Sequence, residues 1–466
     1  MLRSLRLEHF KSWKHIDRMR LAPITGLFGT NCSGKTSILQ WLLLLKQTVE
    51  SPDRLQVLDF GDESSYVQLG TFRDVVHRHN FHESLGWSLA FELPQSLNVR
   101  NPETRDKILF QGKEITFEGR VSQDEQGRPF VEEMGYQFAN HCFALHVKDS
   151  LKKQFARSSG NHRYALRDGG ETAYKFKRMP GRPWDLPQPI NCYGFPDEVF
   201  SYYQNAGFLS DLELELQRQL SYRLYYLGPL RDYPRPQYTW GGGQPVDMGR
   251  RGEKVIDAIL SSRDRGEKIS RGKGHKKRSL EEYVAYWLRK LGLIESFQVE
   301  PVAKGSNLFQ VLVRRSGEST SVKITDVGFG ISQILPVITL CYYVPTGSTI
   351  ILEQPEIHLH PSAQAGLADV LIDAVRMRGV QIIVESHSEH LLRRLQLRMA
   401  EHETLSSEDV ALYFCVFREG ESHLVPLEVN TYGSIANWPE HFFGDEFGEM
   451  AAMTRATMQR MREAGA

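Results

Sequence analysis

Nine residues near the N-terminus have the types and the spacing needed to bind phosphate. The stretch from Gly29 to Ser37 reads Gly-Thr-Asn-Cys-Ser-Gly-Lys-Thr-Ser and fits the pattern G-x-x-x-x-G-K-[ST] without a mismatch. In such a loop, successive backbone N–H groups and the positive end of a helix converge on the phosphates. The lysine reaches the β- and γ-phosphates, and the hydroxyl that follows it ligates Mg²⁺. We therefore expect a bound nucleoside triphosphate with Mg²⁺, with contacts from Gly29, Asn31, Ser33, Gly34, Lys35, Thr36 and Ser37.

This loop needs a buried strand before it and a helix after it. Ile24 to Phe28 is a short apolar run typical of a buried strand, and Ser37 to Lys46 has the composition of the following helix. Strand, glycine loop and helix therefore follow one another in the required order, which predicts a P-loop NTPase core of the α/β class.

A second set of polar residues lies at the ends of two later apolar runs. The first run, Thr349 to Leu352, leads into Glu353. The second, Val380 to Val384, leads into Glu385-Ser-His-Ser, so that His387 follows a strand end. Ligands of parallel α/β sheets bind at the carboxyl ends of the strands. Glu353 is therefore placed to hold Mg²⁺, and His387 to contact a γ-phosphate.

Glycines also precede a strongly apolar helix between Gly317 and Cys341. Gly328-Phe-Gly330 lies at its predicted start, which makes a second helix N-terminus suited to phosphate. One chain cannot easily bring two such helix ends to one γ-phosphate. A dimer can do so, if the loop of one subunit faces the nucleotide of the other.

The sequence divides into two parts of this core, two insertions between them and a tail. We expect the first part of the ATPase core in residues 1–80, a β-rich insertion with an antiparallel meander in 81–195, a helical region with a basic loop in 196–315, the second part of the core in 316–430, and a helical tail in 431–466. Ser210-x-x-Glu213 resembles a capping box and predicts a helix start at Ser210. No heptad repeat is sustained between the phosphate loop and residue 320, so we expect a compact head without a coiled-coil arm.

Composition excludes several classes of protein. Basic and acidic side chains balance at 57 each, so any contact with nucleic acid must be local. Segments 151–182 and 261–280 are locally basic and are the candidates for contacting DNA or RNA, although a solvated sheet face and a mobile loop are the simpler readings.

The five cysteines are scattered and form no C-x-x-C pair, which favours a reduced, cytoplasmic protein. No run is long enough to cross a bilayer, so no membrane partner is expected.

Taken in order, these motifs resemble the ABC-type head ATPases, and within them the RecF/SMC-like branch and the OLD-like prokaryotic AAA ATPases. The resemblance covers about residues 1–80 and 315–430, while the middle matches loosely. The tail from Asn437 to Glu449 resembles the C-terminal segment of a subgroup of unknown function. Relatives of this kind are often encoded beside nucleases or other effectors of anti-phage defence.

The resemblance implies roles for individual residues. Lys35 and Thr36 hold phosphate and Mg²⁺, Glu353 is the Walker B acid, His387 is the switch histidine, and Gly328 and Gly330 form the signature that a second subunit contributes. Gln68 is the candidate for the glutamine that senses Mg²⁺ in such heads.

Two departures from the family pattern affect catalysis. Gln354 stands where the catalytic glutamate is usual, and it can orient water but cannot accept a proton. Hydrolysis is then slow, or Glu356 acts as the base. Gly328 replaces the usual serine of the signature, and Ser332, one turn later, is the candidate to compensate.

Three functions remain open at this point. The first is an ATPase that dimerises or oligomerises on ATP and gates an effector or nuclease partner, in anti-phage defence or DNA maintenance. The second is an ATP-dependent OLD-like nuclease, although too few residues follow the strand pair at 412–429 for a Toprim domain. The third is a nucleotide-gated scaffold with little turnover. A zinc site is an alternative reading of His358, His360, His387 and His390, but the ATPase interpretation already explains three of these.

Overall fold

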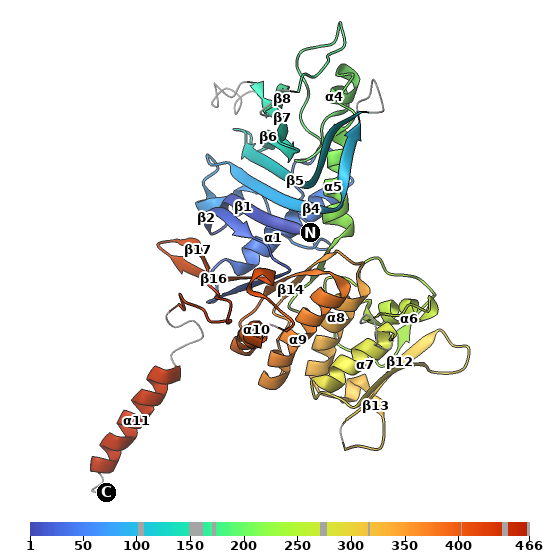
Figure 1. The fold of residues 1–466 in the computed structure, drawn as a ribbon, viewed down its shortest axis with the longest axis vertical. Helices are drawn as coiled ribbons and strands as arrows, with labels where there is room; N and C mark the ends of the chain where they lie inside the picture. Colours follow the sequence, from blue (N-terminus) through green and yellow to red (C-terminus); the bar gives the residue numbers. More distant parts are fainter. Residues whose placement is uncertain are drawn as a thin grey trace.

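The structure is a computed structural model of the 466-residue chain. It describes residues 1–100, 107–148, 162–169, 174–270, 277–315, 317–401, 403–439 and 446–463. The molecule is elongated, with a large antiparallel sheet at one end and a second sheet covered by helices at the other (Figure 1). The phosphate loop directly follows a strand of the second sheet.

This second sheet has six strands in the order β17-β16-β3-β15-β14-β9, of which all but β17 run parallel. The strands are mostly continuous apolar runs, as is typical of strands buried on both faces. The bounds are β3 Ile24–Gly29, β9 Leu224–Leu227, β14 Thr349–Glu353, β15 Gln381–Glu385, β16 Val410–Arg418 and β17 Glu421–Pro426.

Helices cover both faces of the six-stranded sheet. One face, with Ile351 and Ile383, packs in the core that contains α1, and the other, with Ile350 and Ile382, packs in the core that contains α8, α9 and α10. The predicted helix after the phosphate loop is α1, which is confirmed with wider bounds. The helices are α1 Lys35–Glu50, α8 Phe329–Tyr343, α9 Pro361–Arg378 and α10 Glu389–Glu401.

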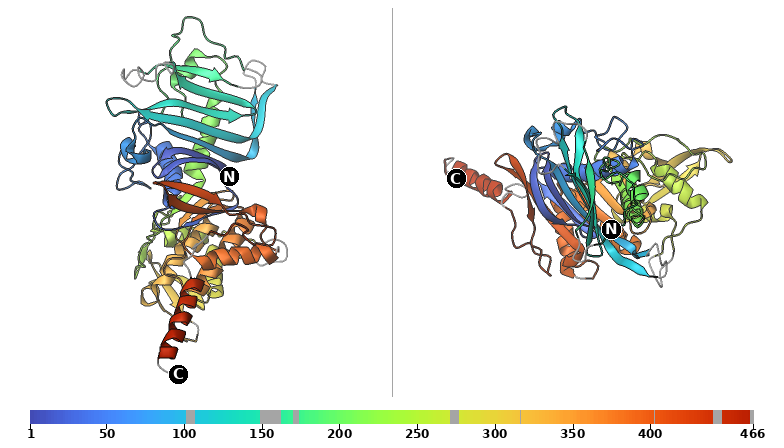
Figure 2. Two further views of the ribbon diagram at one scale, coloured as in Figure 1. Left: turned by 90° about the vertical axis from the view of Figure 1, so that its left-hand side faces the viewer. Right: turned by 90° about the horizontal axis from the view of Figure 1, so that it is seen from above.

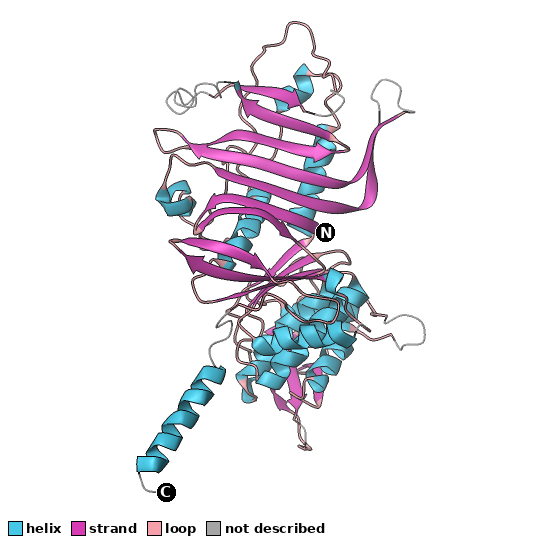
Figure 3. Cartoon of the chain, turned by 60° about the vertical axis from the view of Figure 1, so that its left-hand side comes forward, coloured by secondary structure: helices cyan, strands magenta, loops and turns pink. Residues whose placement is uncertain are grey.

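The predicted antiparallel meander is confirmed, but it does not stand alone. The seven-stranded sheet has the order β2-β1-β4-β5-β6-β7-β8, so the meander continues the N-terminal hairpin (Figures 2 and 3). Its inner face packs against α1, where the rings of Trp41 and Trp87 lie 5.1 Å apart. The strands are β1 Leu2–Phe10, β2 Trp13–Arg20, β4 Leu85–Arg100, β5 Ile108–Gln123, β6 Pro129–Phe138, β7 His141–Val147 and β8 Tyr164–Asp168.

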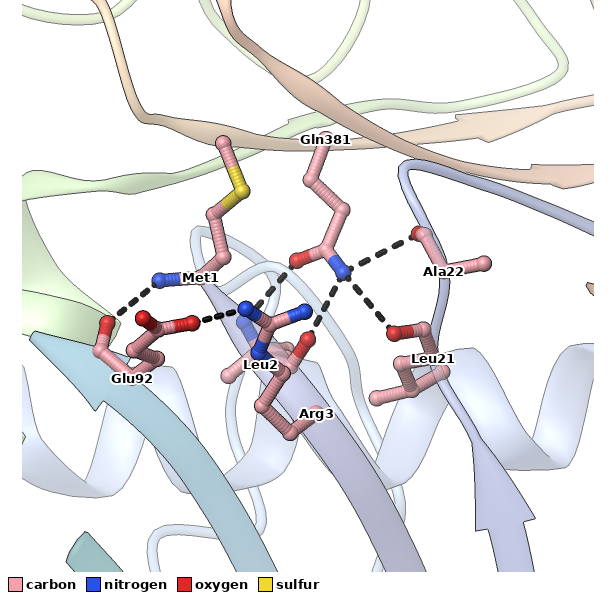
Figure 4. Close-up of polar contacts among 7 residues, drawn as sticks. All are labelled: Met1, Leu2, Arg3, Leu21, Ala22, Glu92 and Gln381. Carbon is pink, nitrogen blue, oxygen red and sulfur yellow. Dashed lines mark hydrogen bonds and ion pairs between the residues drawn. The ribbon is translucent and has the colours of Figure 1, made fainter. Parts of the chain in front are cut away.

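Gln381, the first residue of β15, is one of the residues at which the two sheets meet (Figure 4). Its Oε1 atom accepts from the backbone N–H of Leu2 at 2.9 Å, and its Nε2 atom donates to the carbonyl of Leu2 at 2.7 Å. The same amide donates to the carbonyl of Ala22 at 3.1 Å. This buried side chain therefore satisfies backbone groups of β1 and of the turn before β3, which is how a buried polar group avoids the cost of desolvation.

The helical region consists of α4 Asp197–Tyr202, α5 Leu209–Gln217, α6 Val255–Asp264 and α7 Leu280–Lys290, followed by the predicted hairpin of β11 Ser296–Pro301 and β12 Leu308–Arg314. The predicted capping box at Ser210 is wrong. Helix α5 begins at Leu209, and the carboxylate of Glu213 instead accepts from the backbone N–H of Phe195. A tertiary donor, the N–H of Phe195, thus takes the place of the local backbone donor that a capping box would use.

The two basic segments are described only in part. Residues 151–161, 170–173 and 271–276 lie outside the described residues, so the predicted nucleic-acid contacts stay untested. The start of the second segment is not a loop, because α6 runs to Asp264 and Arg263 pairs with Glu281.

The predicted helical tail contains α11 Glu446–Glu463. None of the helices in the described part of the chain has both the length and the apolar character needed to cross a bilayer, and all five cysteines are free.

Candidate functional site

The phosphate loop has the backbone conformation that its glycines permit. Gly29 has φ +138° and Gly34 has φ +88°, a region that side-chain-bearing residues rarely adopt. A Cβ on Gly34 would lie 2.6 Å from the hydroxyl of Ser422 and 2.9 Å from the indole nitrogen of Trp13. The loop is therefore closed on one side by packed side chains and turns its other side outward.

Within the loop, the exposed residue Asn31 faces solvent while Ser33 is only 1% exposed. The Ser33 hydroxyl has no hydrogen-bond partner among the described residues. A buried hydroxyl without a partner is costly, and an anion in the loop is a group that would satisfy it.

Lys35 is folded onto the loop that precedes it. Its Nζ atom donates to the carbonyl of Gly29 at 3.1 Å and to that of Thr30 at 2.7 Å. Burial lowers the pKa of Lys35, and the nearby carboxylate of Glu385 opposes that shift. The ammonium is thus held at the loop, with carbonyl partners that a phosphate could replace by stronger charge-assisted bonds.

The carboxylate nearest to Thr36 belongs to Glu385. The Thr36 Oγ1 atom lies 3.0 Å from Oε1 and 2.9 Å from Oε2 of Glu385. Strand order explains this contact. Strand β15 lies between β3 and β14 in the sheet. Glu385, at the end of β15, is therefore nearer to α1, the helix that follows β3, than Glu353 at the end of β14.

Glu353 ends β14 and is the register partner of Glu385. Its Oε1 atom accepts from the Tyr226 hydroxyl at 3.1 Å. Burial raises the pKa of Glu353 to about 7, with a further contribution from Glu385, while Tyr226 and Arg231 act in the opposite direction. The predicted metal-binding acid therefore lies beside a second acid.

Arg231 contacts the end of β14, and the sequence analysis assigned it no role. It is 2% exposed, and its Nη2 atom donates to the carbonyl of Glu353 at 2.9 Å. Its Nε and Nη1 atoms have no hydrogen-bond partner in the described part of the chain. Burial lowers the pKa of Arg231 to about 10, with Glu356 foremost among the acids that oppose the shift. A buried cation thus faces the acids of the site.

Gln354 and Glu356 shape the turn after β14. Gln354 has φ +43° and its N–H donates to the carbonyl of Glu385 at 2.8 Å. The Oε1 atom of Glu356 accepts from the N–H of His387 at 2.7 Å, and its Oε2 atom has no hydrogen-bond partner in the described residues. Burial raises the pKa of Glu356. The two segments that follow β14 and β15 are therefore joined to each other, and His387 is brought to the same edge of the sheet.

The glycine signature forms the start of α8, as predicted. Gly328 caps the helix and is exposed, and a Cβ on Gly330 would lie 2.8 Å from the carbonyl of His358. Ser332 is buried and donates to the carbonyl of Phe329 at 2.6 Å, so its hydroxyl is used within its own helix. Ser332 is thus poorly placed to supply the hydroxyl that Gly328 lacks.

Gln68 is the predicted Mg²⁺ sensor, and His360 belongs to the alternative zinc reading. Gln68 is exposed, two residues after Tyr66, whose ring packs edge-on against Tyr226; its role as a Mg²⁺ sensor stays a prediction. His360 Nδ1 lies 2.9 Å from the Ser362 hydroxyl at the start of α9. Within the described ranges, no three His, Cys, Asp or Glu side chains are grouped so as to hold a metal by themselves.

The phosphate loop, the parallel strand order and the acids at the strand ends define a mixed α/β P-loop ATPase fold with an added antiparallel sheet. Residues 257–392 match the family model described as an AAA ATPase domain. Residues 405–453 match that of a protein family of unknown function (DUF3696). These ranges contain the signature, both acidic strand ends and part of the tail, but not the phosphate loop. They confirm the coarser part of the predicted resemblance.

Similar solved structures are heads of SMC proteins. An Smc head bound to the C-winged helix domain of ScpA has a TM-score of 0.44 and 12% identity, covering 92% of this chain and 98% of that one. An SMC head domain from Thermotoga maritima has a TM-score of 0.40 and 12% identity, covering 92% and 99%. An Smc head with an extended coiled coil, bound to a ScpA domain derived from Pyrococcus furiosus, has a TM-score of 0.40 and 11% identity, covering 92% and 96%. No curated protein sequence matches the chain.

Proposed function

We propose that this protein binds ATP with Mg²⁺ at the loop from Gly29 to Ser37 and hydrolyses it. The observation that carries the proposal is the position of the loop, because its lysine and threonine lie directly beside a buried acid, Glu385. The residues fit both groups. The buried Ser33 hydroxyl, which has no hydrogen-bond partner among the described residues, and the Lys35 ammonium are groups that would bind an anion. The Thr36 hydroxyl and the strand-end carboxylates are the oxygen ligands that Mg²⁺ prefers.

The chain's own groups would act as follows. Lys35 exchanges the carbonyls of Gly29 and Thr30 for phosphate oxygens, and Thr36 and Glu353 hold the metal, which supplies charge neutralisation of the phosphates when bound. Gln354 lies at the end of β14, where its amide would orient a water molecule. Proton acceptance must come from another group, since an amide is not a base.

We further propose that the nucleotide site is completed by a second copy of the chain. Gly328 caps an exposed helix N-terminus, and such an end attracts phosphate. ATP would thus promote a homodimer or higher oligomer, and its hydrolysis would gate a partner effector, in anti-phage defence or DNA maintenance as the resemblance implies.

A nucleotide-gated scaffold is the second candidate, and Gln354 is the residue that favours it. Little turnover is expected if no carboxylate replaces the missing base. No observation among the described residues favours a nuclease in the same way.

The test is ATP turnover and oligomeric mass of the wild type beside Lys35→Ala. Turnover and ATP-dependent assembly that both vanish in the variant support the gating ATPase. Tight ATP binding and assembly without turnover support the scaffold. Absence of ATP binding by the folded wild type would refute both.

A further inference from the structure

Two acidic side chains end neighbouring strands directly beside the phosphate loop. Strands β14 and β15 are parallel, with Glu353 opposite Glu385 in register. Paired residues of adjacent strands point to the same face of a sheet. Both side chains are buried, with 6% and 2% of their surface exposed, and Thr36 Oγ1 is within 3.0 Å of both carboxylate oxygens of Glu385.

Acidic side chains outnumber basic ones around this pair. Three buried acids gather here, Glu353, Glu356 and Glu385, and the buried cations among their charge partners are Lys35 and Arg231. Buried charges are costly unless they are paired or bound to a metal. With all three carboxyls ionised, the acids would exceed the two cations by one negative charge, which a bound divalent cation would offset.

Unsatisfied polar atoms lie at the same place. Glu356 is 6% exposed, and its Oε2 atom has no hydrogen-bond partner in the described structure. The Nε and Nη1 atoms of Arg231 also have no hydrogen-bond partner there. Buried polar groups without a partner are uncommon in folded proteins and call for a ligand, an ion or ordered water. The Glu356 oxygen is therefore an acceptor that a cation could satisfy, whereas the Arg231 donors call for an acceptor such as a water molecule.

Building on the ATPase proposed above, we propose that Glu385 and Glu353 together hold a divalent cation, with the Thr36 hydroxyl as a third ligand, and that this site binds the cation before nucleotide arrives. The sequence motifs alone assign the metal to Thr36 and Glu353, with Gln68 as a sensor. Glu385 is the added ligand. Mg²⁺ is usually bound through one or two carboxylates and keeps several waters, so two acids and one hydroxyl suffice. The Thr36 oxygen has lone pairs free for a cation while its proton is donated to Glu385.

The experiment is a titration of the nucleotide-free full-length protein with Mn²⁺, followed by the electron paramagnetic resonance signal of the free ion. The wild type should bind one Mn²⁺, and Glu385→Gln and Glu353→Gln should each weaken that affinity by at least about tenfold. Thr36→Val should weaken it severalfold. Glu389→Gln is the matched control, because Glu389 starts the next helix and pairs with Arg393, and it should leave Mn²⁺ binding unchanged.

Binding of a fluorescent ATP analogue in the presence of Mg²⁺ is measured on separate samples of the same proteins. If the wild type binds no analogue, the proposed function fails while the Mn²⁺ result still decides the cation site. Equal Mn²⁺ affinity in wild type and Glu385→Gln overturns the cation site, and so does a wild type that binds no Mn²⁺ without nucleotide. If circular dichroism shows that Glu385→Gln is unfolded, Thr36→Val decides: unchanged affinity in that variant overturns the proposal.

Discussion

The backbone N–H of His387 donates a 2.7 Å hydrogen bond to the Oε1 atom of Glu356, and this bond fixes the turn after β14 to the turn after β15. The same carboxylate leaves its Oε2 atom buried without a hydrogen-bond partner among the described residues. The bond of Glu356 to His387 thus depends on an acceptor oxygen, whereas the role of base that the sequence suggested depends on an ionisable carboxyl.

Substitutions of Glu356 separate these two roles. Glutamine keeps an acceptor oxygen for His387, whereas alanine does not. If positioning dominates, Glu356→Gln should retain at least about tenfold more ATP turnover than Glu356→Ala, because a lost hydrogen bond to a buried group costs about 1–3 kcal/mol. The measurement is kcat at saturating ATP. Equal loss in the two variants would show that Glu356 is the base.

Gly34→Ala should destabilise the phosphate loop. The new methyl group meets the side chains of Ser422, Ser12 and Trp13 within 2.9 Å, at φ +88°. Gly242→Ala is the control, because Gly242 has φ +83° with no atom within 4 Å of the place that its new methyl group would take. Both changes carry the cost of the left-handed backbone, about 1–2 kcal/mol. Thermal unfolding should show a larger loss for Gly34→Ala, and only that variant should lose ATP binding. Equal losses would contradict the crowding that the structure shows.

Tyr226→Phe should weaken the cation site without unfolding the protein. It removes the 3.1 Å hydrogen bond to Glu353, worth about 0.5–1.5 kcal/mol. Because that bond favours the charged carboxylate, Mn²⁺ affinity should fall severalfold. Tyr225→Phe removes a similar bond, to the carbonyl of Tyr222, and should leave Mn²⁺ affinity unchanged. A comparable loss in both variants would argue against a specific role for Tyr226.

Arg231→Lys should lower the free energy of unfolding by about 1.5–3 kcal/mol, because hydrogen bonds to charged donors have this strength and a lysine lacks the planar fork. The bond at risk is the one to the carbonyl of Glu353. Arg250→Lys is the control, since Arg250 is exposed and also donates to two backbone carbonyls, those of Ser65 and Glu63. Denaturant titrations of the two variants compare a buried and an exposed arginine. A greater loss for Arg250→Lys would be contrary to expectation.

Stability should depend on pH through Glu213. Burial raises the pKa of this carboxyl from 4.5 to about 7. The folded state thus binds more protons than the unfolded state between these values, so this group's contribution to stability is present below pH 4.5 and is lost as the pH rises through 7. Glu213→Gln should match the wild type near pH 5 and exceed it near pH 8 by on the order of 2 kcal/mol. Thermal unfolding at the two pH values gives the comparison, and a difference that does not change with pH would show that Glu213 titrates normally.

Local patterns were enough to predict the phosphate loop, the strand before it and the two later strands. Glycines, apolar runs and a lysine at fixed spacing each have a local physical meaning. Strand order has no such signature. Glu385 was visible as an acid at the end of an apolar run, the same signal that identified Glu353, but only the position of β15 between β3 and β14 places it against Thr36.

Other residues of the site come from segments that carry no motif. Tyr226 lies on β9, and Arg231 follows it, about 120 residues before Glu353 in the chain. Their contacts are tertiary and arise because β9 pairs with β14. The error at Ser210 has the same origin, since Glu213 is used by Phe195 and not by its own helix terminus.

Strand β15 carries Gln381 at one end and Glu385 at the other, and it is only five residues long. Its first side chain forms hydrogen bonds with the backbone of β1, which lies between β2 and β4. Its last side chain accepts a hydrogen bond from the Thr36 hydroxyl. The strand therefore links the N-terminal hairpin to the acidic edge of the six-stranded sheet, beside other contacts between the two sheets such as those of Ser422 with Ser12 and of Tyr413 with Arg20.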